Sequence, residues 1–104
     1  MNGYQVSFFF EQDRRHDGAA MHEWLLRTAR SLGIEGGTLL PASEGYGRAG
    51  RLHSAHFVEL GDQPVEFTMA MTTERATALF ELLERERVDL FYVKTAIEFG
   101  RVGG

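Results

Sequence analysis

The chain has 104 residues, a formal net charge of −4, 43% hydrophobic residues and no cysteine. This length suits one core and excludes two, and the lack of cysteine excludes disulfides, thiolate metal sites and a cysteine nucleophile. The net acidity argues against general nucleic-acid binding, no apolar run approaches the ~20 residues of a membrane span, and no signal peptide is visible. We therefore expect one cytoplasmic domain over residues 1–104, with a loose tail at 100–104 and no direct membrane insertion.

The N-terminal third predicts a strand followed by a helix. Apolar and polar residues alternate from Tyr4 to Phe10, which is strand periodicity. A polar turn over 12–18 follows, and Asp17 is predicted to be the helix N-cap. Helical spacing then extends to Gly33, a residue that favours the left-handed end of a helix. The predicted buried face of this helix holds Met21, Leu25, Thr28, Ala29 and Leu32.

The remainder predicts four strand-like segments and a second helix. Residues 38–40 form a short strand, placed at a sheet edge because Pro41 cannot donate to a ladder. Strand character returns over 54–60 and 65–71, and the last strand alternates over 91–99. A helix beginning at Thr72 or Thr73 has its apolar residues at i, i+3, i+4 and i+7: Ala76, Leu79, Phe80 and Leu83.

This order of elements predicts an α+β, ferredoxin-like βαββαβ fold. Its antiparallel sheet carries two helices on one face, and a long loop or extra strand separates strands 2 and 3. The helices are expected to bury Val6, Phe8, Phe67, Val93 and Ile97. The opposite face is expected to carry Ser7, Phe9, Thr68, Ala70, Tyr92 and Ala96, together with some charges. Because that face is less polar than a solvated one, we expect a second copy of the chain to cover it.

The glycine-rich connection 44–51 is the main candidate for a binding site. Glycines allow close backbone approach, consecutive amides can form an anion-binding nest, and Arg48 and Arg51 can bind phosphate or carboxylate. A flexible hairpin connection with solubilising charges explains the same composition. The spacing of Gly45, Gly47 and Gly50 is no dinucleotide fingerprint, because a strand follows it.

Two further clusters are candidates for chemistry. Arg14, Arg15 and His16 precede the first helix, where they form either an anion site at its positive end or a solvated turn. His53 and His56 point to opposite faces of a strand, so no metal site is expected. No nucleophile motif accompanies the acids and histidines, so we expect no enzyme.

Five runs of the chain carry a resemblance to a known family: Asp13-Arg14-Arg15-His16, Glu23-Trp24-Leu25, Ala29-Arg30-x-Leu32-Gly33-Ile34-x-Gly36-Gly37-Thr38, Glu44-Gly45-Tyr46-Gly47 and Arg51-Leu52-His53. They resemble domain-of-unknown-function family 190, a bacterial family similar to the PII signalling proteins. The resemblance covers about residues 3–99 and implies a trimeric ferredoxin-like fold, with a nucleotide site in the cleft between subunits.

The stretch Gly45-Tyr46-Gly47-Arg48 looks like the Gly-Phe-Gly-Arg segment at the start of the mobile PII loop. In that family the base of the loop lines the nucleotide site, and the loop contacts regulated partners. The second phosphate loop of PII proteins, rich in glycine and lysine, is not matched, because residues 86–89 contain neither. The resemblance therefore leaves Arg14, Arg15 and Arg87 as the other cations for a nucleotide.

These features together predict a non-enzymatic, PII-like trimer that senses a small anion such as an adenine nucleotide. It would act through its mobile loop on a protein partner such as a membrane transporter or an enzyme. The alternatives are a small hydrolase of phosphorylated or acyl-phosphate substrates and a ligand-independent interaction adaptor. The predicted ligand-binding residues are Arg14, Arg15, Gly45, Tyr46, Gly47, Arg48, Arg51 and His53.

Overall fold

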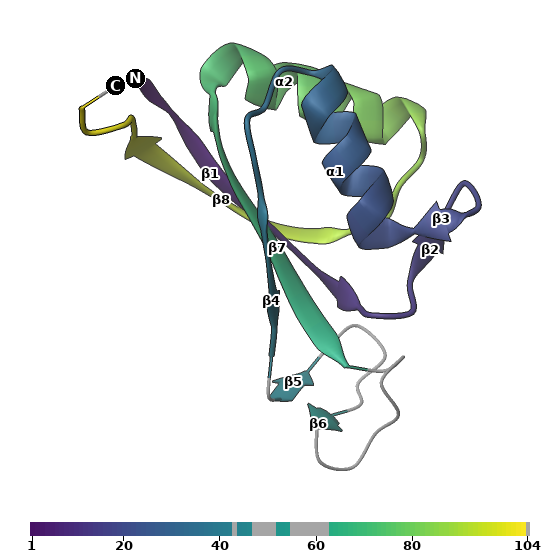
Figure 1. The fold of residues 1–104 in the computed structure, drawn as a ribbon. Helices are drawn as coiled ribbons and strands as arrows, with labels where there is room; N and C mark the ends of the chain where they lie inside the picture. Colours follow the sequence, from purple (N-terminus) through teal and green to yellow (C-terminus); the bar gives the residue numbers. More distant parts are fainter. Residues whose placement is uncertain (43, 47–51, 55–62, 104) are drawn as a thin grey trace.

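The computed structural model describes residues 1–42, 44–46, 52–54 and 63–103 and is built around an antiparallel sheet (Figure 1). The strands of this sheet are β1 (Asn2–Glu11), β4 (Thr38–Pro41), β7 (Pro64–Thr72) and β8 (Phe91–Glu98). They lie in the order β4–β7–β1–β8. Helix α1 (Met21–Ser31) precedes β4, and helix α2 (Thr73–Arg85) joins β7 to β8. The α+β, ferredoxin-like order predicted from the sequence is confirmed.

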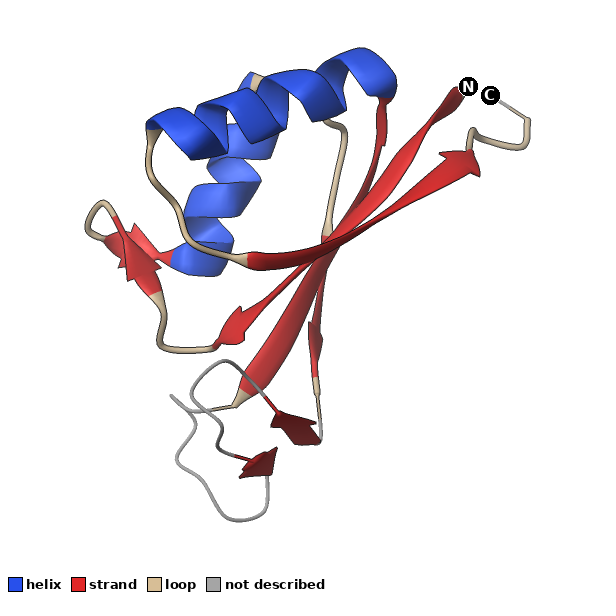
Figure 2. Cartoon of the chain, turned by 180° about the vertical axis from the view of Figure 1, so that it is seen from behind, coloured by secondary structure: helices blue, strands red, loops and turns tan. Residues whose placement is uncertain are grey.

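Both helices lie on one side of the sheet, and the core fills the space between the two layers (Figure 2). Side chains alternate along a strand, so every second residue of β1 and β7 faces the helices. The core consists of these inward positions, one face of each helix and a residue shortly after α1: Val6, Phe8, Phe10, Met21, Trp24, Leu25, Ala29, Ile34, Val65, Phe67, Met69, Met71, Ala76, Leu79 and Leu83.

The predicted helix ends are confirmed at Gly33 and Thr72. Gly33 has a φ of 80°, and its N–H donates to Arg30 while the next N–H donates to Ala29. These two bonds form a Schellman motif, which ends α1. Thr72 is the N-cap of α2, and its hydroxyl accepts a 3.3 Å bond from the Arg75 N–H.

A small hairpin lies where the sequence predicted only a turn. Strands β2 (Arg15–His16) and β3 (Ala19–Ala20) pair antiparallel, and α1 begins directly after them. Asp17 was predicted to be the N-cap of α1, and this prediction is wrong. It occupies the tip of the hairpin at a φ of 53°, beside Gly18 at 80°. Asp-Gly favours a tight hairpin turn, but two-residue strands are too short to show periodicity.

The register of β8 places its residues on the faces opposite to those predicted. Ser7 pairs with Val93, and Phe8 pairs with Tyr92. Tyr92 therefore shares the helix-facing side with Phe8, and its ring lies 4.8 Å from that of Phe80 in α2. Val93 shares the other side of the sheet with Ser7.

Four assignments are corrected by this register. Val93 and Ile97 were predicted to lie in the core, but they lie on the face away from the helices. Tyr92 and Ala96 were predicted on that face, but they point towards the helices. Strand β8 carries apolar residues on both faces, so alternation alone does not identify the inner one, and a one-residue shift exchanges the faces.

Beyond the ends of β4 and β7, β5 (Glu44–Tyr46) pairs antiparallel with β6 (Leu52–Ser54) (Figure 1). This pair lies in the segment where a long loop or an extra strand was expected between strands 2 and 3. The strand predicted over 54–60 shares Ser54 with β6. Residues 55–60 lie outside the described residues. Of the helices described, neither is long and apolar enough to cross a membrane.

Candidate functional site

The glycine-rich segment is described only in part. Gly45 lies directly opposite His53 in the β5–β6 ladder, and Tyr46 lies opposite Leu52, so three of the predicted residues belong to neighbouring strands. Gly47, Arg48 and Arg51 lie outside the described residues. Ligand binding by this segment stays a prediction.

Arg14 and Arg15 make separate contacts. The Arg14 guanidinium donates a 2.7 Å bond to the carbonyl of Asp89, in the connection between α2 and β8. The Arg15 guanidinium donates a 2.8 Å bond to the carbonyl of Gly18 within its own hairpin. The two predicted anion-binding arginines therefore do not converge on one point here, and each has a structural contact.

The connection between α2 and β8 is attached to the hairpin at a second point. His16 Nε2 lies 3.2 Å from Glu86 Oε1, and the His16 ring meets the Trp24 ring edge-on at 4.4 Å. Arg87 follows with a φ of 55°. This is the connection that lacks the glycines and lysine of the PII phosphate loop, and here His16 and Arg14 contact it instead.

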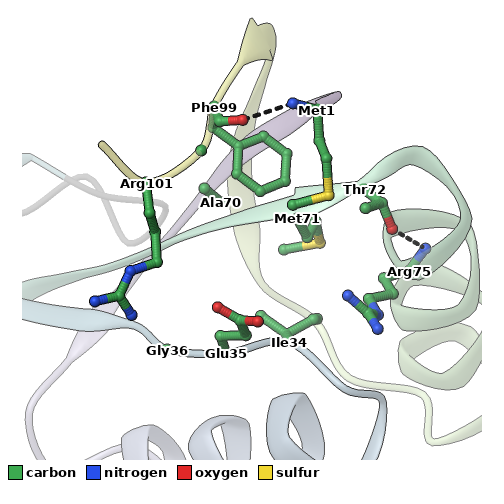
Figure 3. Close-up of a pocket in the computed structure, with 11 residues that line it drawn as sticks. Met1, Ile34, Glu35, Gly36, Ala70, Met71, Thr72, Arg75, Phe99 and Arg101 are labelled. Atoms are coloured by element: carbon green, nitrogen blue, oxygen red, sulfur yellow. Dashed lines mark hydrogen bonds between the residues drawn. The ribbon is translucent and has the colours of Figure 1, made fainter. Parts of the chain in front are cut away.

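A pocket of about 420 Å³ lies at the other end of the sheet (Figure 3). The segment after α1, the corner between β7 and α2, and both ends of the chain surround it. Met1 and Phe99 hold the chain ends together, since the N–H groups of each donate 2.8 Å bonds to the carbonyl of the other. The pocket is lined by Met1, Ile34, Glu35, Gly36, Ala70, Met71, Thr72, Arg75, Phe99, Gly100 and Arg101.

Three charged side chains border this largely apolar cavity. Arg75 and Arg101 lie on opposite sides of it in Figure 3, with Glu35 between them. None of the three side chains forms an ion pair or a hydrogen bond with another described residue. The described residues contain no cluster of histidines and carboxylates placed to hold a metal. Two guanidinium groups beside apolar walls suit a small organic anion.

The pocket and the β5–β6 ladder lie at opposite ends of β7. The pocket includes Thr72, the last residue of that strand, whereas the β5–β6 ladder lies beyond its first residue, Pro64. Nine residues of strand span roughly 30 Å. Within one chain, the two regions therefore cannot contact the same small ligand.

The open face of the sheet, which points away from the helices, is more apolar than a solvated face. Phe91 is 68% exposed and its ring lies 5.8 Å from that of Phe9, while Leu40 and Val93 are each 46% exposed. A polar strip runs between them, where the Ser7 hydroxyl donates to Glu66 at 2.8 Å. The open face comprises Gln5, Ser7, Phe9, Thr38, Leu40, Glu66, Thr68, Ala70, Phe91, Val93, Thr95 and Ile97.

No sequence motif marks the pocket. Its charged residues are single positions in three segments: Glu35 follows α1, Arg75 lies in α2 and Arg101 follows β8. Arg101 was assigned to a loose tail. No spacing rule connects three positions so far apart in the chain, and the nearest signal was the Gly36-Gly37 pair, which indicates close backbone packing.

Comparison with solved structures supports the fold. CPII from Thiomonas intermedia K12, a nitrogen regulatory PII-like protein bound to ADP, AMP and bicarbonate, is 17% identical with a TM-score of 0.73. The match covers 98% of this chain and 92% of that one. A putative PII-like signaling protein from Thermus thermophilus is 17% identical with a TM-score of 0.64, covering 93% and 86%. The apo form of CPII is 14% identical, with a TM-score of 0.63 and coverage of 97% and 95%.

At these identities the likeness establishes a shared PII-like fold. No curated protein matches the sequence. Residues 3–93 match the family DUF190, described as Uncharacterized ACR, COG1993. That match spans most of the chain, including both helices and the glycine-rich segment, so the protein belongs to domain-of-unknown-function family 190.

Proposed function

We propose that the protein is a non-enzymatic, PII-like regulator that binds a small anionic ligand and acts on a protein partner through residues 44–64. The partner would be a membrane transporter or an enzyme. The family and the fold support the regulatory part of this proposal. Binding of a small anionic ligand requires a binding site, and the pocket is the strongest candidate among the described residues.

The observation that carries the proposal is the pair of guanidinium groups beside the apolar cavity. A pocket of about 420 Å³ is large enough for a nucleotide-sized molecule. Arg75 and Arg101 can each donate charge-assisted hydrogen bonds to phosphate or carboxylate oxygens. Apolar contacts with Ile34, Met71 and Phe99 would bind an uncharged ring.

An adenine nucleotide is the first ligand to test. CPII has the same fold and was crystallised with ADP, AMP and bicarbonate. The connection after α2 here contains Glu86 and Asp89 and no lysine. We therefore propose that phosphate contacts come from arginines, with Arg48 and Arg51 joining those of the pocket.

Such a joint site requires more than one copy of the chain. The exposed apolar side chains of the open face suit burial against other copies. Assembly of copies can bring the β5–β6 ladder of one chain close to the pocket of another. We propose a homotrimer, as the resemblance to PII proteins implies, with the ligand between subunits.

Isothermal titration calorimetry with ADP, AMP, ATP, cyclic dinucleotides and bicarbonate tests the proposal. We expect saturable binding of at least one of them by the wild type, and weaker binding by Arg48→Ala. Absence of heat from the whole panel would overturn the ligand-sensor proposal. A pull-down that depends on residues 46–53 but not on any ligand would favour an adaptor instead.

A further inference from the structure

The Arg75 side chain lies against the backbone at the end of α1. A Cβ atom built on Gly33 would lie 3.1 Å from Arg75 Nε and 3.2 Å from Nη2. A Cβ atom at position 33 would therefore be in tight contact with the guanidinium, which would have to shift by a few tenths of an ångström. Gly33 is also held at a φ of 80°, where side chains other than hydrogen are strained.

This contact places a cation at a defined point of the pocket wall. Arg75 is in the first turn of α2, and its own N–H is bound to the N-cap hydroxyl of Thr72, so its backbone is fixed. Its guanidinium borders the pocket and forms no ion pair with another described residue. Within the described part of the chain no residue accepts from its five N–H donors, so these donors are available to a ligand.

The rest of the pocket limits what that ligand can be. Ile34, Met71 and Phe99 supply apolar contact area, and sulfur and ring atoms pack well against flat rings. Arg101 borders the cavity on the other side from Arg75, and Glu35 lies between them (Figure 3). The two arginines outnumber the single carboxylate, which favours a ligand carrying negative charge.

We propose that Arg75, positioned by Gly33, binds the anionic group of the ligand and so selects an aromatic ring that carries a phosphate or carboxylate over the uncharged ring compound. This inference rests on the proposed function and adds a specificity-determining residue to it. The hydrogen bonds from Arg75 to such a group are charge-assisted and therefore stronger than bonds between neutral groups.

A purely structural role for Arg75 predicts a different outcome. The guanidinium lies near the C-terminal end of α1, where a cation stabilises the helix dipole. In that case, replacing Arg75 lowers the melting temperature and leaves ligand affinity unchanged. Affinity and stability must therefore be measured on the same variants.

The test compares Arg75→Gln with Arg85→Gln. Arg85 is the last residue of the same helix and is exposed, so both variants lose one positive charge from α2. Calorimetry with ADP and with adenosine separates the contribution of the phosphates from that of the ring. We expect Arg75→Gln to weaken ADP binding roughly 10- to 100-fold, as for the loss of a charged hydrogen bond, and to leave adenosine binding unchanged. Arg85→Gln should bind ADP as the wild type does.

The outcomes separate this inference from the proposed function. If the wild type binds ADP and Arg75→Gln binds it equally well, the assignment of Arg75 is wrong while the ligand-sensor function stands. Equal weakening in both variants would show a general charge effect and would also overturn the assignment. If the wild type binds none of the panel, both proposals fail.

A second variant, Gly33→Ala, should displace the guanidinium and weaken ADP binding without removing any charge. Unchanged ADP affinity in a folded Gly33→Ala protein would contradict the positioning role.

Discussion

His16 and Trp24 form an edge-to-face ring pair with centroids 4.4 Å apart, and this pair links the small hairpin to α1. The same histidine contacts Glu86 beyond α2 at 3.2 Å. His16 thus contacts α1 and the connection that follows α2, two parts of the chain that lie far apart in the sequence. Its position explains how a hairpin of four paired residues keeps a defined place on the domain.

We expect His16→Ala to lower the free energy of unfolding by about 1–2 kcal/mol, because it removes both the ring pair and the Glu86 contact. Glu86→Gln removes only a half-exposed charge contact and should cost at most about 1 kcal/mol. Urea denaturation followed by circular dichroism measures both.

Trp24 is the sole tryptophan, so its fluorescence should change in His16→Ala and stay near wild type in Glu86→Gln. Equal spectra for all three proteins would contradict the ring contact.

Charge on the open face should dissociate the proposed oligomer. Val93 lies on the edge strand β8, pairs with Ser7 of β1 and is 46% exposed, so Val93→Asp would place a carboxylate in the buried interface of the proposed assembly. Light scattering should show a mass near that of one chain, with circular dichroism unchanged. The control is Thr77→Asp, on the exposed side of α2, which should keep the wild-type mass. A monomeric wild type would overturn the proposal of an oligomer.

Gly37 is required by the packing of Phe67. A Cβ atom on Gly37 would lie 2.6 Å from Cζ of the Phe67 ring, which is 3% exposed and cannot move freely. We expect Gly37→Ala to cost about 1–3 kcal/mol through overpacking. The neighbouring Gly36→Ala has nothing within 4 Å of its added atom and should be close to neutral.

A double-mutant cycle with Phe67→Leu tests that explanation. The smaller side chain should leave room for the alanine, so the cost of Gly37→Ala should fall in the Phe67→Leu background. Additive effects in urea denaturation would show that the loss of stability has another origin.

The hydroxyl of Thr72 should contribute measurably to the start of α2. It accepts a 3.3 Å bond from the Arg75 N–H, so Thr72→Ala leaves that donor without its partner. We expect a loss of about 1 kcal/mol in unfolding free energy, and Thr72→Ser should retain most of the stability because serine caps as well. Thermal and urea denaturation of the two variants provide the comparison; a serine variant as unstable as the alanine one would argue against capping.

Local periodicity in the sequence was sufficient to predict the elements and their order. Alternation in β1 and β7 and helical spacing in α1 and α2 reflect one buried face each, so the pattern indicates both the element and its inner side. The ends at Gly33 and Thr72 follow from backbone chemistry that is local to each residue. The Asp17-Gly18 pair is also a local hairpin signal, although it was interpreted as part of a turn before the helix.

Only the tertiary structure decided which face of β8 points towards the helices and where the pocket lies. Both faces of β8 carry apolar residues, so alternation alone does not identify the inner face; in the fold, Tyr92 contacts Phe80 of α2 on that side. Arg75 and Arg101 border the same pocket because β7 and β8 both flank β1. Periodicity describes neighbours along the chain, whereas this pocket is formed by residues that only the folded sheet brings together.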